Sequence, residues 1–157
     1  LGTLYADKIM SSIGNNFDGV FGPAYKGIPL AITTVISLSR DYSVEKYYCF
    51  NRKEIKDHGE GGGLVGKTPG SGERIIIVED VIRTGLTTAY LISNIESKKP
   101  ASISLCSMLL NPDRLLMTIP VKYYGFEITD QWLIGYGMDL DEIGRNLPYI
   151  AETSRKQ

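Results

Sequence analysis

The sequence predicts a single α/β domain with a central, mostly parallel sheet flanked by helices. The first reason is the run Ile75-Ile76-Ile77-Val78, because consecutive β-branched residues indicate a strand that is buried on both faces. The second reason is the alternation of strand-like and helix-like segments along the chain. The third is size, since 157 residues with 43% hydrophobic content suit one packed core.

The N-terminal third predicts one helix followed by a strand–turn–helix unit. Apolar residues at roughly helical spacing predict the first helix over residues 3–14. A strand is expected over 17–21, then a glycine-bounded turn over 22–27 and an apolar helix over 28–38. Lys26 stands at the tip of that turn, where its charge and the neighbouring N–H groups would suit a pyrophosphate. The alternative is a solvated loop lysine.

A strand over 46–50 leads into a polar, highly charged and glycine-rich loop over about 51–72. The loop contains His58, the only histidine of the chain. Its composition predicts that it is mobile when nothing is bound, and it falls between the two strand–turn–helix units. We expect a catalytic loop here, and the alternative is a solvated linker.

The central unit pairs two carboxylates with a turn that can hold an anion. Glu79 and Asp80 stand where the central strand is expected to end, and a helix is expected from the turn to about Lys98. In open parallel sheets, ligands bind outside the carboxyl ends of strands, and a helix N-terminus offers N–H groups to a phosphate. Residues 84–88 would cradle the phosphate while the acids hold sugar hydroxyls. The segment predicts a ribose phosphate site, unless the acids merely end a strand and cap a turn.

The remainder predicts further strands and one short helix. A buried strand is expected over 102–110 and is broken at 111–114. Two more strands are expected over 120–126 and 132–136, and a short helix over 139–145.

Bulk properties exclude several classes of protein. A formal net charge of −1 and a pI near 5.9 do not indicate a nucleic-acid partner. No apolar run is long enough to span a membrane. Cys49 and Cys106 lie in apolar, strand-like runs, so we expect reduced core thiols in a cytoplasmic protein rather than a disulfide.

Residues 74–88 resemble the signature of type I phosphoribosyltransferases: an apolar strand, two acids, two apolar residues and a Thr-Gly turn. The resemblance implies that the whole chain, 1–157, is one phosphoribosyltransferase domain. It also implies that Glu79 and Asp80 hold the ribose diol of phosphoribosyl pyrophosphate (PRPP). The 5′-phosphate would then lie on the turn formed by Arg83, Thr84, Gly85, Leu86, Thr87 and Thr88.

Residues 1–68 resemble orotate phosphoribosyltransferase more closely, through two long motifs at 22–29 and 50–62. This resemblance implies a homodimer in which the charged loop closes over the partner's active site. The residues that it implies for pyrophosphate contact and catalysis are Lys26, Arg52, Lys53, Lys56 and His58. The N-terminal hood that clasps the pyrimidine in that family would precede Leu1, so we expect the hood to be reduced or missing.

Residues 73–151 look more like hypoxanthine-guanine phosphoribosyltransferase, through motifs at 125–130, 135–139 and 145–150. The match implies a base-site region over about 111–150. By this match Trp132 would stack on a purine, and Asp139 would lie at the base edge or near the pyrophosphate and Mg²⁺. The alternative for Trp132 is a core aromatic.

Two positions depart from the purine enzymes. Those enzymes usually carry an acid just before the Thr-Gly turn, where this chain has Arg83, and a lysine that reads the purine 6-oxygen, where it has Asn111. The mixture is compatible with a divergent natural enzyme, a truncated chain or a chimera.

We therefore expect displacement of pyrophosphate from PRPP by a nitrogenous base, with Mg²⁺ bound through the substrate phosphates and orotate marginally favoured as acceptor. The alternatives are a hypoxanthine-guanine enzyme of purine salvage, a PRPP-binding regulator without catalysis, and an inactive scaffold.

Overall fold

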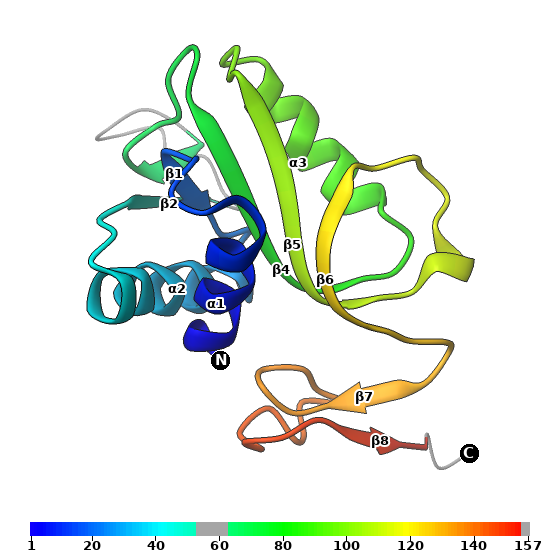
Figure 1. Cartoon of the computed structure of the whole chain (residues 1–157). Helices are drawn as coiled ribbons and strands as arrows, with labels where there is room; N and C mark the ends of the chain where they lie inside the picture. Colours follow the sequence, from blue (N-terminus) through cyan, green and yellow to red (C-terminus); the bar gives the residue numbers. More distant parts are fainter. Residues whose placement is uncertain (53–62, 155–157) are drawn as a thin grey trace.

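The computed structural model describes residues 1–52 and 63–154, and a sheet lies at their centre (Figure 1). Within these ranges the main sheet has six strands in the order β3-β2-β1-β4-β5-β6, and every pairing is parallel except β2 with β3. The strands are β1 Gly19–Phe21, β2 Tyr47–Asn51, β3 Leu64–Gly66, β4 Arg74–Ile82, β5 Ser102–Leu110 and β6 Val121–Glu127. The predicted α/β domain with a mostly parallel sheet is confirmed.

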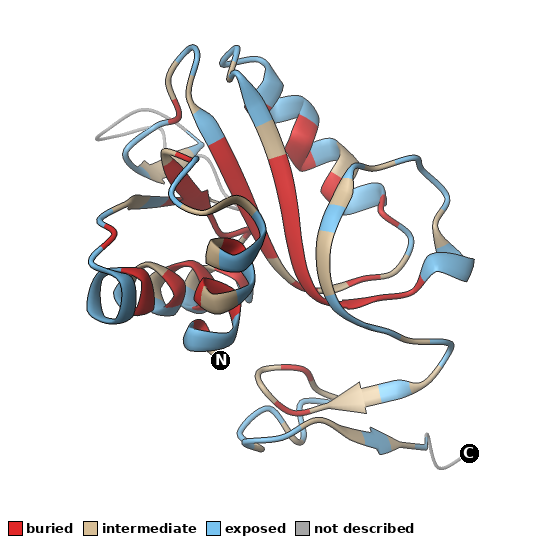
Figure 2. Cartoon of the chain, viewed as in Figure 1, coloured by how far each residue is buried: buried red, intermediate tan, exposed pale blue. Residues whose placement is uncertain are grey.

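Helices cover both faces of this sheet. Helices α1 (Gly2–Ile13) and α2 (Gly27–Tyr42) lie on one face, and α3 (Leu86–Glu96) lies on the other (Figure 1). The burial colouring shows β1 and long stretches of β4 and β5 as buried (Figure 2). This two-sided cover explains why the central strand is apolar without alternation.

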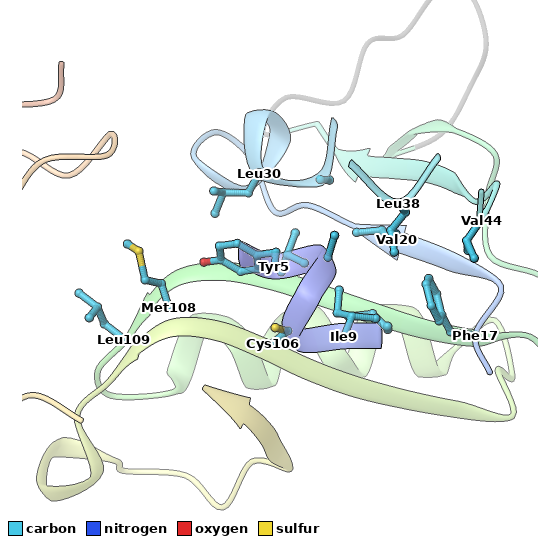
Figure 3. Packing of buried hydrophobic residues seen from close by; sticks show 14 of the residues in the cluster. Tyr5, Ile9, Phe17, Val20, Leu30, Leu38, Val44, Cys106, Met108 and Leu109 are labelled. Carbon is cyan, nitrogen blue, oxygen red and sulfur yellow. The ribbon is translucent and has the colours of Figure 1, made fainter. Parts of the chain in front are cut away.

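Two apolar clusters divide the side chains of β4 by parity. Ile76 and Val78 pack in the cluster that contains Tyr5 and Ile9 of α1, and Figure 3 shows α1 lying over Cys106 of β5. The second cluster joins alternate β4 residues to α3 and consists of Phe21, Cys49, Ile75, Ile77, Leu91, Ile92, Ile95 and Leu105. Successive residues of a strand point to opposite faces, so the apolar run supplies both cores at once.

Both cysteines are free and buried, as expected. Burial raises the pKa of the Cys106 thiol to about 12, so the thiol is protonated and inert at neutral pH. Among the described residues, no helix combines the length and the apolar character that crossing a bilayer requires.

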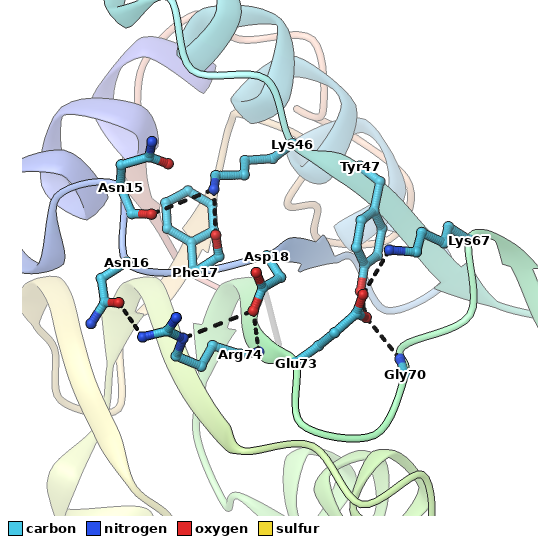
Figure 4. Close-up of polar contacts among 10 residues, drawn as sticks. All are labelled: Asn15, Asn16, Phe17, Asp18, Lys46, Tyr47, Lys67, Gly70, Glu73 and Arg74. Carbon is cyan, nitrogen blue, oxygen red and sulfur yellow. Dashed lines mark hydrogen bonds and ion pairs between the residues drawn. The ribbon is translucent and has the colours of Figure 1, made fainter.

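A polar network fastens the amino end of β4 (Figure 4). Asp18 accepts a hydrogen bond of 2.7 Å from the backbone N–H of Arg74. Glu73 accepts bonds from the Tyr47 hydroxyl at 2.6 Å, the Lys67 ammonium at 2.6 Å and the Gly70 N–H at 2.7 Å. Because three donors stabilise its charged form, the pKa of Glu73 is lowered to about 2. The network ties the approach to β4 to the neighbouring strands.

The central strand runs two residues beyond its predicted end at Glu79 and Asp80. β4 continues through Glu79 and Asp80 to Ile82, because β5 pairs with it as far as the register Ile82–Leu110. The acids therefore lie within the last part of the strand. The turn begins only after Ile82.

The predicted short helix over 139–145 is also wrong. The segment makes turns and one isolated antiparallel bridge, Leu140–Ile143, and a second bridge, Gly135–Met138, lies just before it. Asp141 and Glu142 have φ values of 52° and 67°, and left-handed backbone cannot continue a right-handed helix.

Two strands were not predicted. β3 lies inside the predicted loop 51–72, where Leu64–Gly66 pairs with β2. β8 (Ala151–Thr153) pairs with β7 (Trp132–Ile134) in a small antiparallel sheet, which lies beyond the end of β6 (Figure 1). Short edge strands carry little periodicity, so the sequence signal for both is weak. The loop was predicted to be mobile, and most of the residues that this prediction concerns, 53–62, lie outside the described residues.

Candidate functional site

The carboxyl end of β4 brings an almost fully buried acid to Lys26, which lies in the turn just before α2. Asp80 is 6% exposed, and its Oδ1 accepts a 2.8 Å hydrogen bond from the N–H of Val81. Its Oδ2 is buried without a hydrogen bond from the described residues and lies 3.5 Å from Nζ of Lys26. A buried carboxylate oxygen that lacks a donor is costly, so this atom is suited to accept one from a ligand.

Glu79, the neighbouring acid, holds its proton unusually well. Burial is the main cause and the adjacent charge of Asp80 the second, and together they raise the pKa of Glu79 to about 8, against the opposing effect of Lys26. A protonated carboxyl can donate as well as accept a hydrogen bond. The pair therefore offers both kinds of partner to a diol.

Lys26 joins the end of β4 to the C-terminal turns. Its Nζ lies 3.9 Å from Oδ1 of Asp139, and this oxygen also accepts an ion-pair contact of 2.8 Å from Nη1 of Arg145. Oδ2 of Asp139 accepts the N–H of Glu142 at 3.0 Å. The structure thus places Asp139 beside Asp80 and Lys26 rather than beside Trp132.

The turn after β4 presents the start of α3. Gly85 has φ +75°, a conformation that favours glycine, and a β-carbon there would lie 3.1 Å from Ile119. The first helical bond runs from the N–H of Ala89 to the carbonyl of Gly85, so the preceding amides have no helical acceptor. Thr84 and Thr87 are exposed at this end. This end of α3 therefore presents backbone N–H groups of the kind that bind anions at helix starts.

A separate open hollow of about 390 Å³ lies on the other side of the turn, lined by Arg83, Thr84, Arg114, Asp130 and Trp132. Nη2 of Arg83 donates a 2.7 Å hydrogen bond to the carbonyl of Gln131. Trp132 is 49% exposed, so it is not a core aromatic. Sequence reasoning assigned Arg83 to the phosphate turn, whereas its guanidinium reaches toward the tryptophan.

Asn111 lies behind this hollow and is fully buried. Its Nδ2 donates to the carbonyl of Thr129 at 2.8 Å and approaches Asp130 Oδ1 at 3.4 Å. Its backbone N–H donates to the carbonyl of Ile82 at 2.8 Å. The side chain therefore holds the segment that carries Asp130, and it is not among the residues that line the hollow.

The pyrophosphate residues expected from the loop are only partly described. Lys53, Lys56 and His58 lie outside the described residues. The N–H of Arg52 donates to the carbonyl of Gly63 at 2.7 Å, and its side chain lines another hollow with residues of α3. Oδ1 of Asn51 accepts the N–H of Ala24 at 2.9 Å, which ties the end of β2 to the turn before Lys26.

Several residues of the site were missed by sequence reasoning. Arg145 is the first residue of a motif used for the purine resemblance, but its ion pair with Asp139 was not predicted. Arg114 and Asp130 form an ion pair across a loop, and Tyr5 reaches the site from α1. The motifs at 125–130 and 145–150 contain Asp130 and Arg145, but no local signal identifies the contacts themselves, because each contact joins segments that are distant in the sequence.

Fold and site together describe an α/β protein with an arrangement suited to a sugar phosphate: two carboxylates lie near the carboxyl end of one strand, a turn and a helix start follow, and a lysine faces the acids from the neighbouring strand–turn–helix unit. The chain belongs to the phosphoribosyl transferase domain family, whose model matches residues 1–141.

Curated relatives carry the name orotate phosphoribosyltransferase. The Clostridium beijerinckii protein is 42% identical over 115 residues, which cover 73% of this chain and 50% of that protein. The Actinobacillus pleuropneumoniae serotype 5b protein is 56% identical over 85 residues, covering 54% and 38%. The chain thus spans about half the length, or less, of the curated relatives it matches.

Solved structures similar to this fold are purine enzymes by name. A hypoxanthine-guanine phosphoribosyltransferase from Bacillus anthracis superposes with a TM-score of 0.72 at 26% identity and covers 96% of this chain and 88% of that one. A hypoxanthine phosphoribosyltransferase from Trypanosoma cruzi gives 0.75 at 20% identity, with 98% and 84% coverage, which shows the fold alone. The expected resemblance to both groups is confirmed.

Proposed function

We propose that this chain transfers ribose 5-phosphate from PRPP to a nitrogenous base, with orotate as the acceptor. The observation that carries the proposal is the buried Oδ2 of Asp80, which has no hydrogen bond from the described residues and lies beside Glu79, Lys26 and the phosphate turn. This arrangement matches the parts of PRPP in order: diol, pyrophosphate and 5′-phosphate.

In the proposed reaction, the bond from the anomeric carbon to pyrophosphate breaks and a bond to a ring nitrogen forms, with release of the ring N–H proton. Glu79 and Asp80 hold the ribose hydroxyls, and residues 84–88 hold the 5′-phosphate. Positive charge from Lys26, Arg52, Lys53 and Lys56 stabilises the leaving pyrophosphate. His58 donates a proton to it, because histidine titrates near neutral pH.

The described residues suit Mg²⁺ only as a partner of the substrate. They contain no group of three or more metal-binding side chains. Both oxygens of Asp139 are engaged, by Arg145 and by the N–H of Glu142, whereas Asp80 Oδ2 has no hydrogen bond from the described residues and would be open to the hydrated ion. When bound through the phosphates, Mg²⁺ supplies charge that offsets the negative charge of pyrophosphate.

Orotate is favoured by the names of the curated relatives and by the residues of the 51–62 segment. Hypoxanthine or guanine is the second candidate, because similar solved structures are purine enzymes and Trp132 lines the hollow next to the turn. We also place the protein in the cytoplasm as a homodimer that shares its loop, which follows from the family resemblance.

The test is pyrophosphate release from PRPP and Mg²⁺ with orotate, hypoxanthine, guanine, xanthine, adenine or uracil in separate reactions. Asp80→Asn should lower kcat/KM at least about 100-fold, while Asp113→Asn on the exposed 3₁₀ turn should change it little. PRPP binding without release for any base would contradict the transferase and leave a PRPP-binding regulator. Release with a purine alone would replace orotate.

A further inference from the structure

We propose that the hollow beside the phosphate turn, which we call the Trp132 hollow, selects an acceptor ring that carries a carboxylate, and that Arg83 is the residue that reads this charge. The hollow is lined by Arg83, Thr84, Arg114, Asp130 and Trp132. The inference rests on the proposed function, because it assigns the substrate class of the same site.

The charges that line the hollow do not cancel. Arg114 is paired with Asp130 through Nε to Oδ1 at 2.7 Å and Nη2 to Oδ2 at 2.5 Å. Arg83 adds a second guanidinium, whose Nη2 donates a hydrogen bond to the neutral carbonyl of Gln131. Two cations and one anion leave one net positive charge among the lining residues. A ring with a single negative charge complements it.

Arg83 is also held in place before any ligand arrives. Its backbone follows β4, and its side chain is tied to Gln131, the residue before β7. A guanidinium has five N–H donors, so one bond to a carbonyl leaves others for a carboxylate. Because the group is already anchored, little side-chain entropy is lost when it binds. Trp132 contributes an aromatic side chain to the lining of the hollow.

The same geometry disfavours a neutral purine. The guanidinium of Arg83 stays protonated, so it offers hydrogen-bond donors and a positive charge but no acceptor. It gains less from a neutral ring than from a carboxylate, because charge-assisted hydrogen bonds are the stronger ones. Arg83, which departs from the pattern of the purine enzymes, therefore has a function of its own: it binds the carboxylate of the acceptor ring.

The experiment is calorimetric titration of the protein with orotate and with uracil, which lacks the carboxylate, each in the presence and absence of ribose 5-phosphate. Wild type should bind orotate more tightly than uracil. Arg83→Gln should weaken orotate binding roughly 10- to 100-fold and leave uracil unchanged, and Arg83→Lys should retain part of the preference. Arg40→Gln, an exposed change on α2, is the matched control.

Equal binding of orotate and uracil to wild type, or an unchanged ratio in Arg83→Gln, would overturn the inference. So would a loss of PRPP affinity in Arg83→Gln with orotate binding intact, since Arg83 would then serve the 5′-phosphate. Titration does not depend on turnover. A wild type that prefers orotate but releases no pyrophosphate would refute the proposed function and still support the charge selection.

Discussion

The hydroxyl group of Tyr5 on α1 donates a 2.5 Å hydrogen bond to the backbone carbonyl of Glu79 on β4. β1 pairs with β4 only from Ile75 to Ile77, so no described strand accompanies that edge of β4 at the acids. Tyr5 is 4% exposed and packs in the cluster under α1 (Figure 3). A side chain thus supplies a donor near the point where the sheet pairing ends.

Removing this hydroxyl should weaken the site as well as the fold. Tyr5→Phe leaves a carbonyl without its donor, which should cost about 1–2 kcal/mol of unfolding free energy. It should also raise the KM for PRPP, because Glu79 is no longer held. Urea unfolding and initial rates measure the two effects. Tyr42→Phe, which removes an exposed 2.7 Å hydrogen bond from the Tyr42 hydroxyl to Asp7, is the control and should change stability by less than about 0.5 kcal/mol.

Glu79 should make the ligand-free protein less stable as pH rises. Its pKa is raised to about 8 in the fold, so between an ordinary carboxyl pKa near 4.5 and pH 8 the folded state binds more protons than the unfolded state. Unfolding free energy then falls with pH across that window, by the order of a few kcal/mol. Glu79→Gln should flatten the slope in urea titrations from pH 5 to 8.5. The same slope in Glu79→Gln and in the surface control Glu96→Gln would contradict the assignment.

Glu73 should make the protein more stable as pH rises from about 2 to 4.5, which is the opposite of the effect of Glu79. Its pKa is lowered to about 2, chiefly by the N–H of Gly70 and then by Lys67 and Tyr47, so its contribution is complete above about pH 4.5 and is lost as pH falls toward 2 (Figure 4). Glu73→Gln should lower the melting temperature at pH 6 and narrow the difference from wild type at pH 2.5. A difference that stays constant across this range would refute the linkage.

Lys26 should contribute to ligand binding more than to stability. In the ligand-free protein it faces Asp80 and Asp139 at 3.5 and 3.9 Å, with its side chain 43% exposed, and such partly exposed pairs add little stability. A pyrophosphate would replace these weak contacts with charge-assisted bonds. Lys26→Met should therefore weaken PRPP binding about 10- to 100-fold and change the melting temperature slightly. Lys122→Met, on β6, should leave PRPP affinity unaltered; a matching loss there would point to a general charge effect.

Local patterns predicted most of the elements, because a strand that is buried on two faces is a run of consecutive apolar residues in the sequence. The run Ile75–Val78 identified the central strand, and the Thr-Gly turn after it identified the helix start. Local patterns failed where backbone conformation overrode them: residues 139–145 contain helix-compatible side chains, yet Asp141 and Glu142 adopt left-handed φ values. They also failed at β3 and β8, which are short edge strands.

The sequence by itself determined the order of the main strands and helices, apart from β3, β8 and the segment 139–145. It also determined the adjacency of Glu79, Asp80 and the turn at 84–88, because these residues are neighbours in the chain. Tertiary structure alone decided that Lys26, Asp80, Asp139 and Arg145 meet, and that Arg83 faces Trp132 rather than the phosphate turn. The physical reason is that such contacts depend on strand order and on how crossovers and C-terminal turns fold back over the sheet, which no local periodicity encodes.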